Sequence, residues 1–211
     1  MAESKKKTGF FGKFLNVLSG RPEENSSEPE TQSLFSSSSK KEPVDLSFVK
    51  NFTASGGKFL YCEQEKDAYE FLTQIAKESH LNSIFCNESN LQSILQKAGI
   101  KVLADDVKSA DAFCSSCEYL ISFNGGIMIT ANQTMGNKLN DLPETFITVA
   151  RTSQIVENLR SGLTGIRNKY SGNIPSQITT IKGPIKASAP EEAGGSTCNK
   201  EVYLLLLEDQ L

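Results

Sequence analysis

From residue 44 onward, the apolar residues of the chain follow two patterns, helical spacing and short continuous runs. Spacing of three or four residues predicts helices over residues 44–54, 66–79, 89–98, 106–112 and 154–170, the last being the longest. Short apolar runs predict strands over residues 58–62, 83–86, 101–103, 119–122, 127–130, 146–150, 176–181 and 202–207. The run 202–207 has no polar alternation, which is typical of a strand buried on both faces of a sheet. Helices that alternate with such strands predict an α/β sandwich.

The first 43 residues differ from the rest. Behind the basic cluster Lys5–Lys7, one apolar stripe at helical spacing predicts an amphipathic helix, formed by Phe10, Phe11, Phe14, Leu15, Val17 and Leu18. Lys13 lies outside this stripe. It interrupts the continuous apolar run that a secretory signal peptide needs, which argues against such a peptide. Residues 21–43 are rich in Glu, Ser, Pro and Lys and predict a flexible linker. We therefore expect a helix with a linker over residues 1–43 and one domain over residues 44–211.

Charge and composition exclude several classes of protein. The chain has 22 Lys and Arg residues and 25 Asp and Glu residues. The resulting net charge of -3 argues against a nucleic-acid partner. No run approaches the ~18 apolar residues that a membrane span needs. The 5 cysteines without a secretory signal indicate reduced thiols in the cytoplasm.

The cysteines and the single histidine predict no metal site. Cys114 and Cys117 form one C-x-x-C pair, whereas four-ligand zinc and iron–sulfur sites need a second pair or histidines. A structural role is favoured for this pair, and a redox-active role stays open. His80 follows a predicted helix, where a solvated or dipole-paired histidine is favoured over a catalytic one. Because no dinucleotide or phosphate-binding glycine motif is present, no cofactor is expected.

The most informative stretch is Ser122-Phe123-Asn124-Gly125-Gly126, between two predicted strands. Asn-Gly at such a place favours a β-hairpin turn of type I′. The same glycines would also let backbone N–H groups approach an anionic ligand. The turn is favoured, although the two interpretations are compatible.

Two further places are typical of ligand contacts. Lys182 and Gly183 follow a predicted strand, and open α/β sheets bind ligands at the carboxyl ends of their strands. Arg151 also ends a predicted strand and is a candidate to hold an anion, with Ser153 as the N-cap of the next helix. The candidate ligand-binding residues are Ser122, Asn124, Gly125, Gly126, Arg151, Lys182 and Gly183.

Several stretches carry a family resemblance in their order and spacing. They are Phe14–Pro22, Ser122–Gly126, Leu142-Pro143 followed by Arg151 and Ser153-Gln154-Ile155-Val156, then Gly183-Pro184 and the final strand. With them the chain resembles the LUD-domain family, in particular the lactate-utilisation protein C (LutC/YkgG-like) group. The resemblance implies a three-layer α/β sandwich of the NagB/RpiA/CoA-transferase-like type.

The resemblance also implies a role beside iron–sulfur oxidoreductase subunits that oxidise L-lactate to pyruvate and carry the redox centres. Phe123 stands where the family often has an acid, and where related CoA transferases have a nucleophilic glutamate. A carboxylate able to form an acyl intermediate is therefore missing at this position. We expect a divergent, auxiliary subunit without a redox cofactor.

Two alternatives remain open. Gly125-Gly126 and Lys182 would suit a small-molecule enzyme of the CoA-transferase-like fold, acting on an acyl-CoA or a phosphorylated metabolite, with Phe123 as the evidence against it. The basic, Phe-rich amphipathic helix would suit a membrane surface, but docking on a partner protein is favoured.

Overall fold

The computed structural model describes residues 42–184 and 200–209. Contacts divide the chain into residues 1–43 and 44–211, and the second unit contains the helices and strands given below. The helix and most of the linker predicted over residues 1–43 lie outside the described residues.

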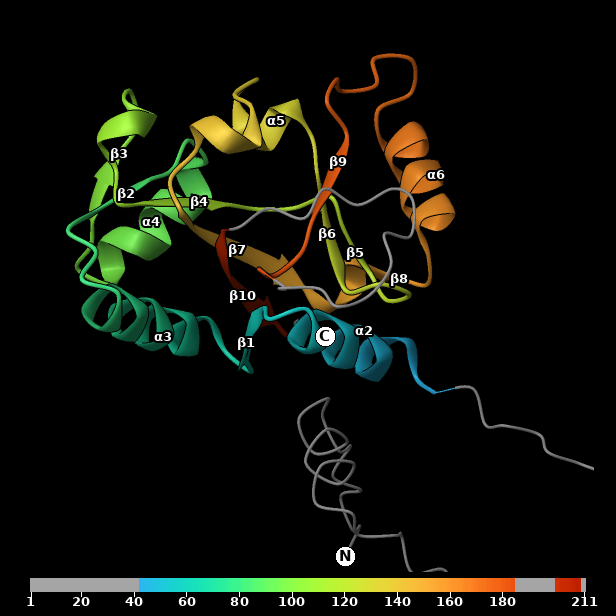
Figure 1. The fold of residues 1–211 in the computed structure, drawn as a ribbon, viewed down its shortest axis with the longest axis horizontal. Helices are drawn as coiled ribbons and strands as arrows, with labels where there is room; N and C mark the ends of the chain where they lie inside the picture. The colour runs from blue at the N-terminus through green and yellow to red at the C-terminus, as the bar shows by residue number, and fades with distance from the viewer. Residues whose placement is uncertain (1–41, 185–199, 210–211) are drawn as a thin grey trace, which may run out of the picture. The chain divides into compact units, whose positions relative to one another are not determined.

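A six-stranded parallel sheet forms the centre of this unit (Figure 1). In spatial order its strands are β1 (Lys58–Cys62), β10 (Glu201–Leu207), β7 (Thr145–Arg151), β4 (Ala112–Ser115), β2 (Ser83–Phe85) and β3 (Lys101–Leu103). All six residues of the run 202–207 are buried, as expected of a strand covered on both faces. The α/β sandwich with a helix-flanked parallel sheet is thereby confirmed.

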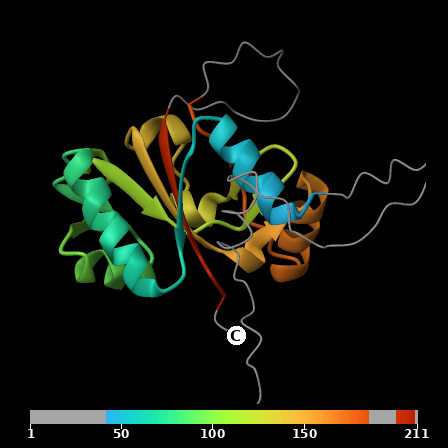
Figure 2. The ribbon, with the colours of Figure 1, turned by 90° about the horizontal axis from the view of Figure 1, so that it is seen from below.

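Helices α3 (Glu65–Glu78) and α4 (Ser89–Lys97) cover one face of this sheet. Their apolar residues recur at helical spacing and join one buried cluster with sheet residues, namely Ala68, Leu72, Ile75, Leu91 and Leu95. Figure 2 shows α3 at one side of the central strands and α6 (Leu159–Lys169) at the opposite side.

A second, four-stranded sheet lies on the other side of the central sheet. Its order is β8 (Ile155–Val156), β5 (Tyr119–Ile121), β6 (Gly126–Ile129) and β9 (Thr179–Ile181). Ile166 of α6 packs on Ile121 and Met128 of this sheet. Helix α2 (Val44–Ala54) packs against both β1 and β8 and so joins the two sheets.

The chain reverses direction across the central sheet between β2 and β4. From β2 it runs outward to β3, returns to β4 and then continues to β7 and β10. The carboxyl ends of β2 and β4 therefore flank the topological switch point, the place where open α/β sheets most often bind ligands.

Two of the predicted helices are wrong in part. Residues 106–112 contain only a 3-10 turn, Val107–Ser109, and then enter β4, whose four residues are all buried. Pairing with β2 and β7 on both sides determines this strand, because its own sequence carries no strand pattern.

The helix predicted over residues 154–170 begins only at Leu159. Ile155 and Val156 instead pair with β5 as a strand, and the side chain of Asn158 caps the helix by accepting a hydrogen bond from the N–H of Ser161 (3.0 Å). The helical spacing of Leu159, Leu163 and Ile166 predicts that all three face inward, but Leu159 and Leu163 are 41% and 42% exposed. With 14 residues, α3 is longer than this helix, which has 11.

Candidate functional site

Residues 122–125 form the loop of a β-hairpin between β5 and β6. The pairing of Ile121 with Gly126 confirms the predicted hairpin. The prediction of a type I′ turn is wrong, because such a turn has two central residues, both with a positive φ. Here four residues separate the strands, and only Gly125 among them has a positive φ (66°). Asn124 supports the loop differently, since its Oδ1 accepts a hydrogen bond from the N–H of Gly126 (3.0 Å).

Helix α2 holds this loop through side-chain hydrogen bonds. The hydroxyl of Ser122 donates to the carbonyl of Val44 (2.7 Å). The Nδ2 of Asn51 donates to the carbonyls of Ser122 (2.8 Å) and Phe123 (3.2 Å). The hairpin tip is therefore fixed in place against the helix.

Gly125 is required by the close approach of that helix. A Cβ on Gly125 would lie 2.3 Å from the backbone nitrogen of Phe52, a contact that no side-chain movement relieves. The N–H groups of Ser122 and Phe123 donate to the carbonyls of Val156 (2.9 Å) and Glu157 (3.0 Å). These two backbone N–H groups, which were expected to be able to approach an anionic ligand, are thus already hydrogen-bonded within the chain.

Gly183 packs on the end of the same helix. A Cβ there would lie 2.2 Å from the nitrogen of Gly57, and its N–H donates to the hydroxyl of Ser55 (3.2 Å). Lys182 follows β9, which is antiparallel to β6 in the second sheet. The parallel-sheet argument for Lys182 is therefore wrong, but the structure does bring Gly183 and the hairpin loop to one helix.

Arg151 lies elsewhere, at the carboxyl end of β7 in the central sheet, and is exposed. Its neighbour Ser153 does not cap a helix. Instead, the N–H of Ser153 (2.6 Å) and the hydroxyl of Thr152 (2.7 Å) donate to the carboxylate of Asp209. Burial alone would raise the pKa of Asp209, but these hydrogen bonds and the charge of Arg151 hold it below its usual value.

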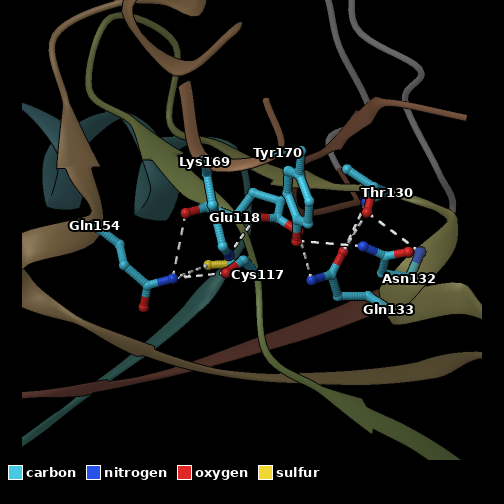
Figure 3. A network of polar contacts seen from close by, with 8 residues as sticks. All are labelled: Cys117, Glu118, Thr130, Asn132, Gln133, Gln154, Lys169 and Tyr170. Atoms are coloured by element: carbon cyan, nitrogen blue, oxygen red, sulfur yellow. Dashed lines mark hydrogen bonds and ion pairs between the residues drawn. The ribbon is translucent and has the colours of Figure 1, made fainter. Parts of the chain in front are cut away.

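Glu118, a buried carboxylate directly before β5, connects this strand with two helices (Figure 3). The ammonium of Lys169, at the end of α6, lies 2.8 Å from Oε2. Oε1 accepts hydrogen bonds from the hydroxyl of Tyr170 (2.8 Å) and from the amide of Gln133 (2.9 Å). Gln133 in turn accepts hydrogen bonds from the N–H (2.9 Å) and the hydroxyl (2.8 Å) of Thr130.

This network keeps Glu118 ionised. Burial raises the pKa of its carboxyl, but the hydrogen bonds from Lys169, Gln133 and Tyr170 outweigh that effect and hold the pKa below its usual value. Burial lowers the pKa of Lys169, but its hydrogen bonds and charge interactions with Glu118 and Tyr170 outweigh that effect and raise the pKa. A carboxylate with donors on both oxygens is suited to anchoring α5 (Ala131–Thr134) and α6, and poorly suited to attack a substrate.

Sequence reasoning missed this network. Its members come from segments up to 52 residues apart, and no local pattern relates them. The one local signal is the capping box of Thr130 and Gln133 at the start of α5.

The four described cysteines, Cys62, Cys86, Cys114 and Cys117, are buried free thiols. Burial raises the pKa of Cys62 to about 12 and raises that of Cys117 as well. Among the described residues, no group of three or more His, Cys, Asp or Glu side chains is arranged to hold a metal ion.

A sequence model of the LUD domain matches residues 90–207, more than half of the chain. The chain belongs to the LUD-domain family. The matched part of this LUD domain contains the hairpin loop, Arg151, the Glu118 network and the C-x-x-C pair. The match does not extend to the LutC/YkgG-like group, which stays a prediction.

The LUD domain is also similar to a solved structure, a DUF162 family protein from Deinococcus radiodurans. The match covers 79% of this chain and 96% of the other, with a TM-score of 0.55 and 18% sequence identity. At this identity the similarity supports the fold alone. No curated protein matches the sequence significantly. In the part of the chain that the structure describes, no helix has the length and apolar character to cross a membrane.

Proposed function

We propose that this LUD domain is an auxiliary subunit of a lactate-utilisation system, working beside iron–sulfur oxidoreductase proteins that oxidise L-lactate. The family membership supports a role in lactate utilisation, because the LUD domain is associated with lactate-utilisation proteins. In the proposed division of labour, the partners carry the redox centres and this chain contributes a binding surface.

The observation that carries the proposal is the side chain at the hairpin tip. Phe123, at the position where related CoA transferases have a nucleophilic glutamate, is 73% exposed. A phenyl ring has no lone pair with which to attack an acyl group, whereas an exposed aromatic ring is a frequent anchor in protein interfaces. Glu118, at the other end of β5, accepts hydrogen bonds on both of its oxygens within the chain.

The rigidity of the loop also suits a binding role. Ser122 and Asn51 fix the loop on α2, so the ring of Phe123 is presented from a backbone that is already ordered. An ordered anchor loses less conformational entropy when a partner binds.

Co-purification from the native cells grown on L-lactate tests the proposal. We expect the tagged chain to recover proteins with iron–sulfur absorbance, and Phe123→Ala to lower that recovery about tenfold, the effect of losing an aromatic anchor. Met135→Ala removes another exposed apolar side chain, 50% exposed on a different loop, and should leave recovery unchanged. Recovery of no iron–sulfur protein by the wild-type chain would contradict the proposal.

The alternative of a CoA-transferase-like enzyme is not favoured. It needs a free nucleophile beside the glycine loop, and the hairpin presents Phe123 instead. Thermal stabilisation of the purified chain by an acyl-CoA or a phosphorylated metabolite would reverse this preference.

A further inference from the structure

Cys86 and Cys114 lie side by side on neighbouring strands. In the parallel pairing of β2 with β4, Ile84 faces Ala112 and Phe85 faces Phe113. The next residues along the chain are Cys86, directly after β2, and Cys114, within β4. Both side chains belong to the same buried cluster, on the face of the sheet that α3 and α4 cover.

The spacing of the two backbones is compatible with a disulfide bond. Neighbouring strands are about 4.8 Å apart, which lies inside the range of about 4.4–6.8 Å between the Cα atoms of bonded cysteines. Cys117, the partner that sequence spacing suggests for Cys114, lies beyond the end of β4, where its carbonyl accepts a hydrogen bond from Gln154 (2.6 Å).

The two cysteines also lie at the topological switch point. Cys86 directly follows β2 and precedes α4, and Cys114 is the last residue but one of β4, before the chain leaves the sheet. The carboxylate of Glu88 joins the two loops by accepting a hydrogen bond from the N–H of Ser116 (2.7 Å). Reactive groups in open α/β sheets are found most often at this edge.

The contact between the thiols makes them unequal. A hydrogen bond between the two sulfurs is the largest effect on both, and it lowers the pKa of Cys86 while raising that of Cys114, which burial raises further. Cys86 is therefore the sulfur that ionises first. Cys62 differs from it, because burial raises its pKa to about 12.

We propose that Cys86 and Cys114 form a redox-active dithiol that a small hydroperoxide converts into a disulfide. This pair replaces the Cys114–Cys117 pair that the sequence motif suggests, and the inference is independent of the function proposed above.

The reaction balances in two steps. The Cys86 thiolate attacks one oxygen of the hydroperoxide; an S–O bond forms, the O–O bond breaks, and the other oxygen leaves and takes up a proton. The Cys114 sulfur then attacks the sulfur of the Cys86 sulfenic acid; the S–S bond forms, the S–O bond breaks, and hydroxide leaves with the Cys114 proton as water. The two thiols lose two electrons in total, and the peroxide gains them.

Peptide mapping after peroxide treatment of the full-length Cys198→Ser chain tests the proposal, since this background removes the cysteine that lies outside the described residues. Trypsin places Cys86 in peptide 78–97 and both Cys114 and Cys117 in peptide 109–138. We expect these peptides to become linked, on the order of tenfold faster than Cys62 is oxidised, and to separate again in dithiothreitol.

Three variants identify the sulfurs. Cys117→Ser should keep the link, Cys114→Ser should lose it and leave a Cys86 sulfenic acid that dimedone labels, and Cys62→Ser should change nothing. Fragment spectra of the linked peptides show whether Cys114 or Cys117 is bonded to Cys86. This readout does not depend on whether the variants fold. A link through Cys117 would overturn the proposal. So would the absence of any link, whether Cys62 is oxidised instead or all thiols survive excess peroxide.

Discussion

At the residue scale, the surroundings of a few single residues in this LUD domain determine what each residue does. Gly125 touches the backbone of α2, Glu118 accepts hydrogen bonds on both oxygens, and Thr148 has a buried hydroxyl with no described partner. These surroundings predict the effect of a substitution on the free energy of unfolding.

Gly125→Ala should destabilise the domain by about 2–4 kcal/mol, because the new Cβ meets immovable backbone and the residue has a positive φ. Gly99→Ala is the matched control. It also has a positive φ (74°) but has nothing within 4 Å of the added Cβ, so it should cost only about 1 kcal/mol. Urea unfolding measures both, and equal losses would mean that the approach of α2 is not the cause.

Thr148→Val should leave stability unchanged or raise it by up to about 1 kcal/mol, because it removes a buried hydroxyl that has no hydrogen-bond partner. In contrast, Thr130→Val removes a hydroxyl that donates to Gln133 (2.8 Å) and should cost about 1–2 kcal/mol. If Thr148→Val costs as much as Thr130→Val, the hydroxyl of Thr148 has a partner in solution.

Glu118→Gln should lower the free energy of unfolding at pH 7 by about 1–3 kcal/mol, because the hydrogen bonds to a charged oxygen are lost. The folded pKa of Glu118 is below its unfolded value of about 4.3. Its contribution is therefore fully present above that pH and is lost as the pH falls through the lower folded pKa. The difference between wild type and variant should shrink across that window in acid titrations of stability; a constant difference would contradict the ion pair.

At the element scale, α6 begins where its cap is and not where its apolar pattern begins. Ile155 and Val156 fit the helical spacing, yet they pair with β5, and the helix starts after Asn158. A capping side chain and an available strand neighbour thus outweigh helical periodicity in this segment.

Asn158→Ala should cost about 1 kcal/mol, because the N–H of Ser161 loses its acceptor. Asn168→Ala, an exposed change on the same helix, should stay within about 0.5 kcal/mol of the wild type. Thermal unfolding of the two variants compares them directly. Equal midpoints would show that Asn158 does not cap the helix.

At the scale of the whole molecule, local patterns predicted what is locally determined. The apolar run 202–207 predicted a strand inside the sheet, and the structure has one there. Most other helices and strands begin and end within a residue or two of their predicted bounds. The sequence pattern did not predict β4, because its four residues form a strand only through their pairing with β2 and β7. The Glu118 network and the Cys86–Cys114 pair also escaped, since both depend on contacts between segments distant in sequence.

The predicted site was only partly assembled by the fold. The hairpin loop and Gly183 meet at α2, whereas Arg151 ends a strand of the central sheet. The glycines that suggested a ligand loop serve the close packing of backbone segments, a role that the sequence does not distinguish from ligand approach.

The most direct measurement of the central claim is the rate of L-lactate-dependent dye reduction by the purified chain, by its co-purified iron–sulfur partners, and by the two combined. We predict no turnover by the chain alone and a rate for the combined fraction well above that of the partners alone. Phe123→Ala should remove that gain, whereas Met135→Ala should keep it. Turnover by the isolated chain, or a partner rate that is the same with and without it, would contradict the account.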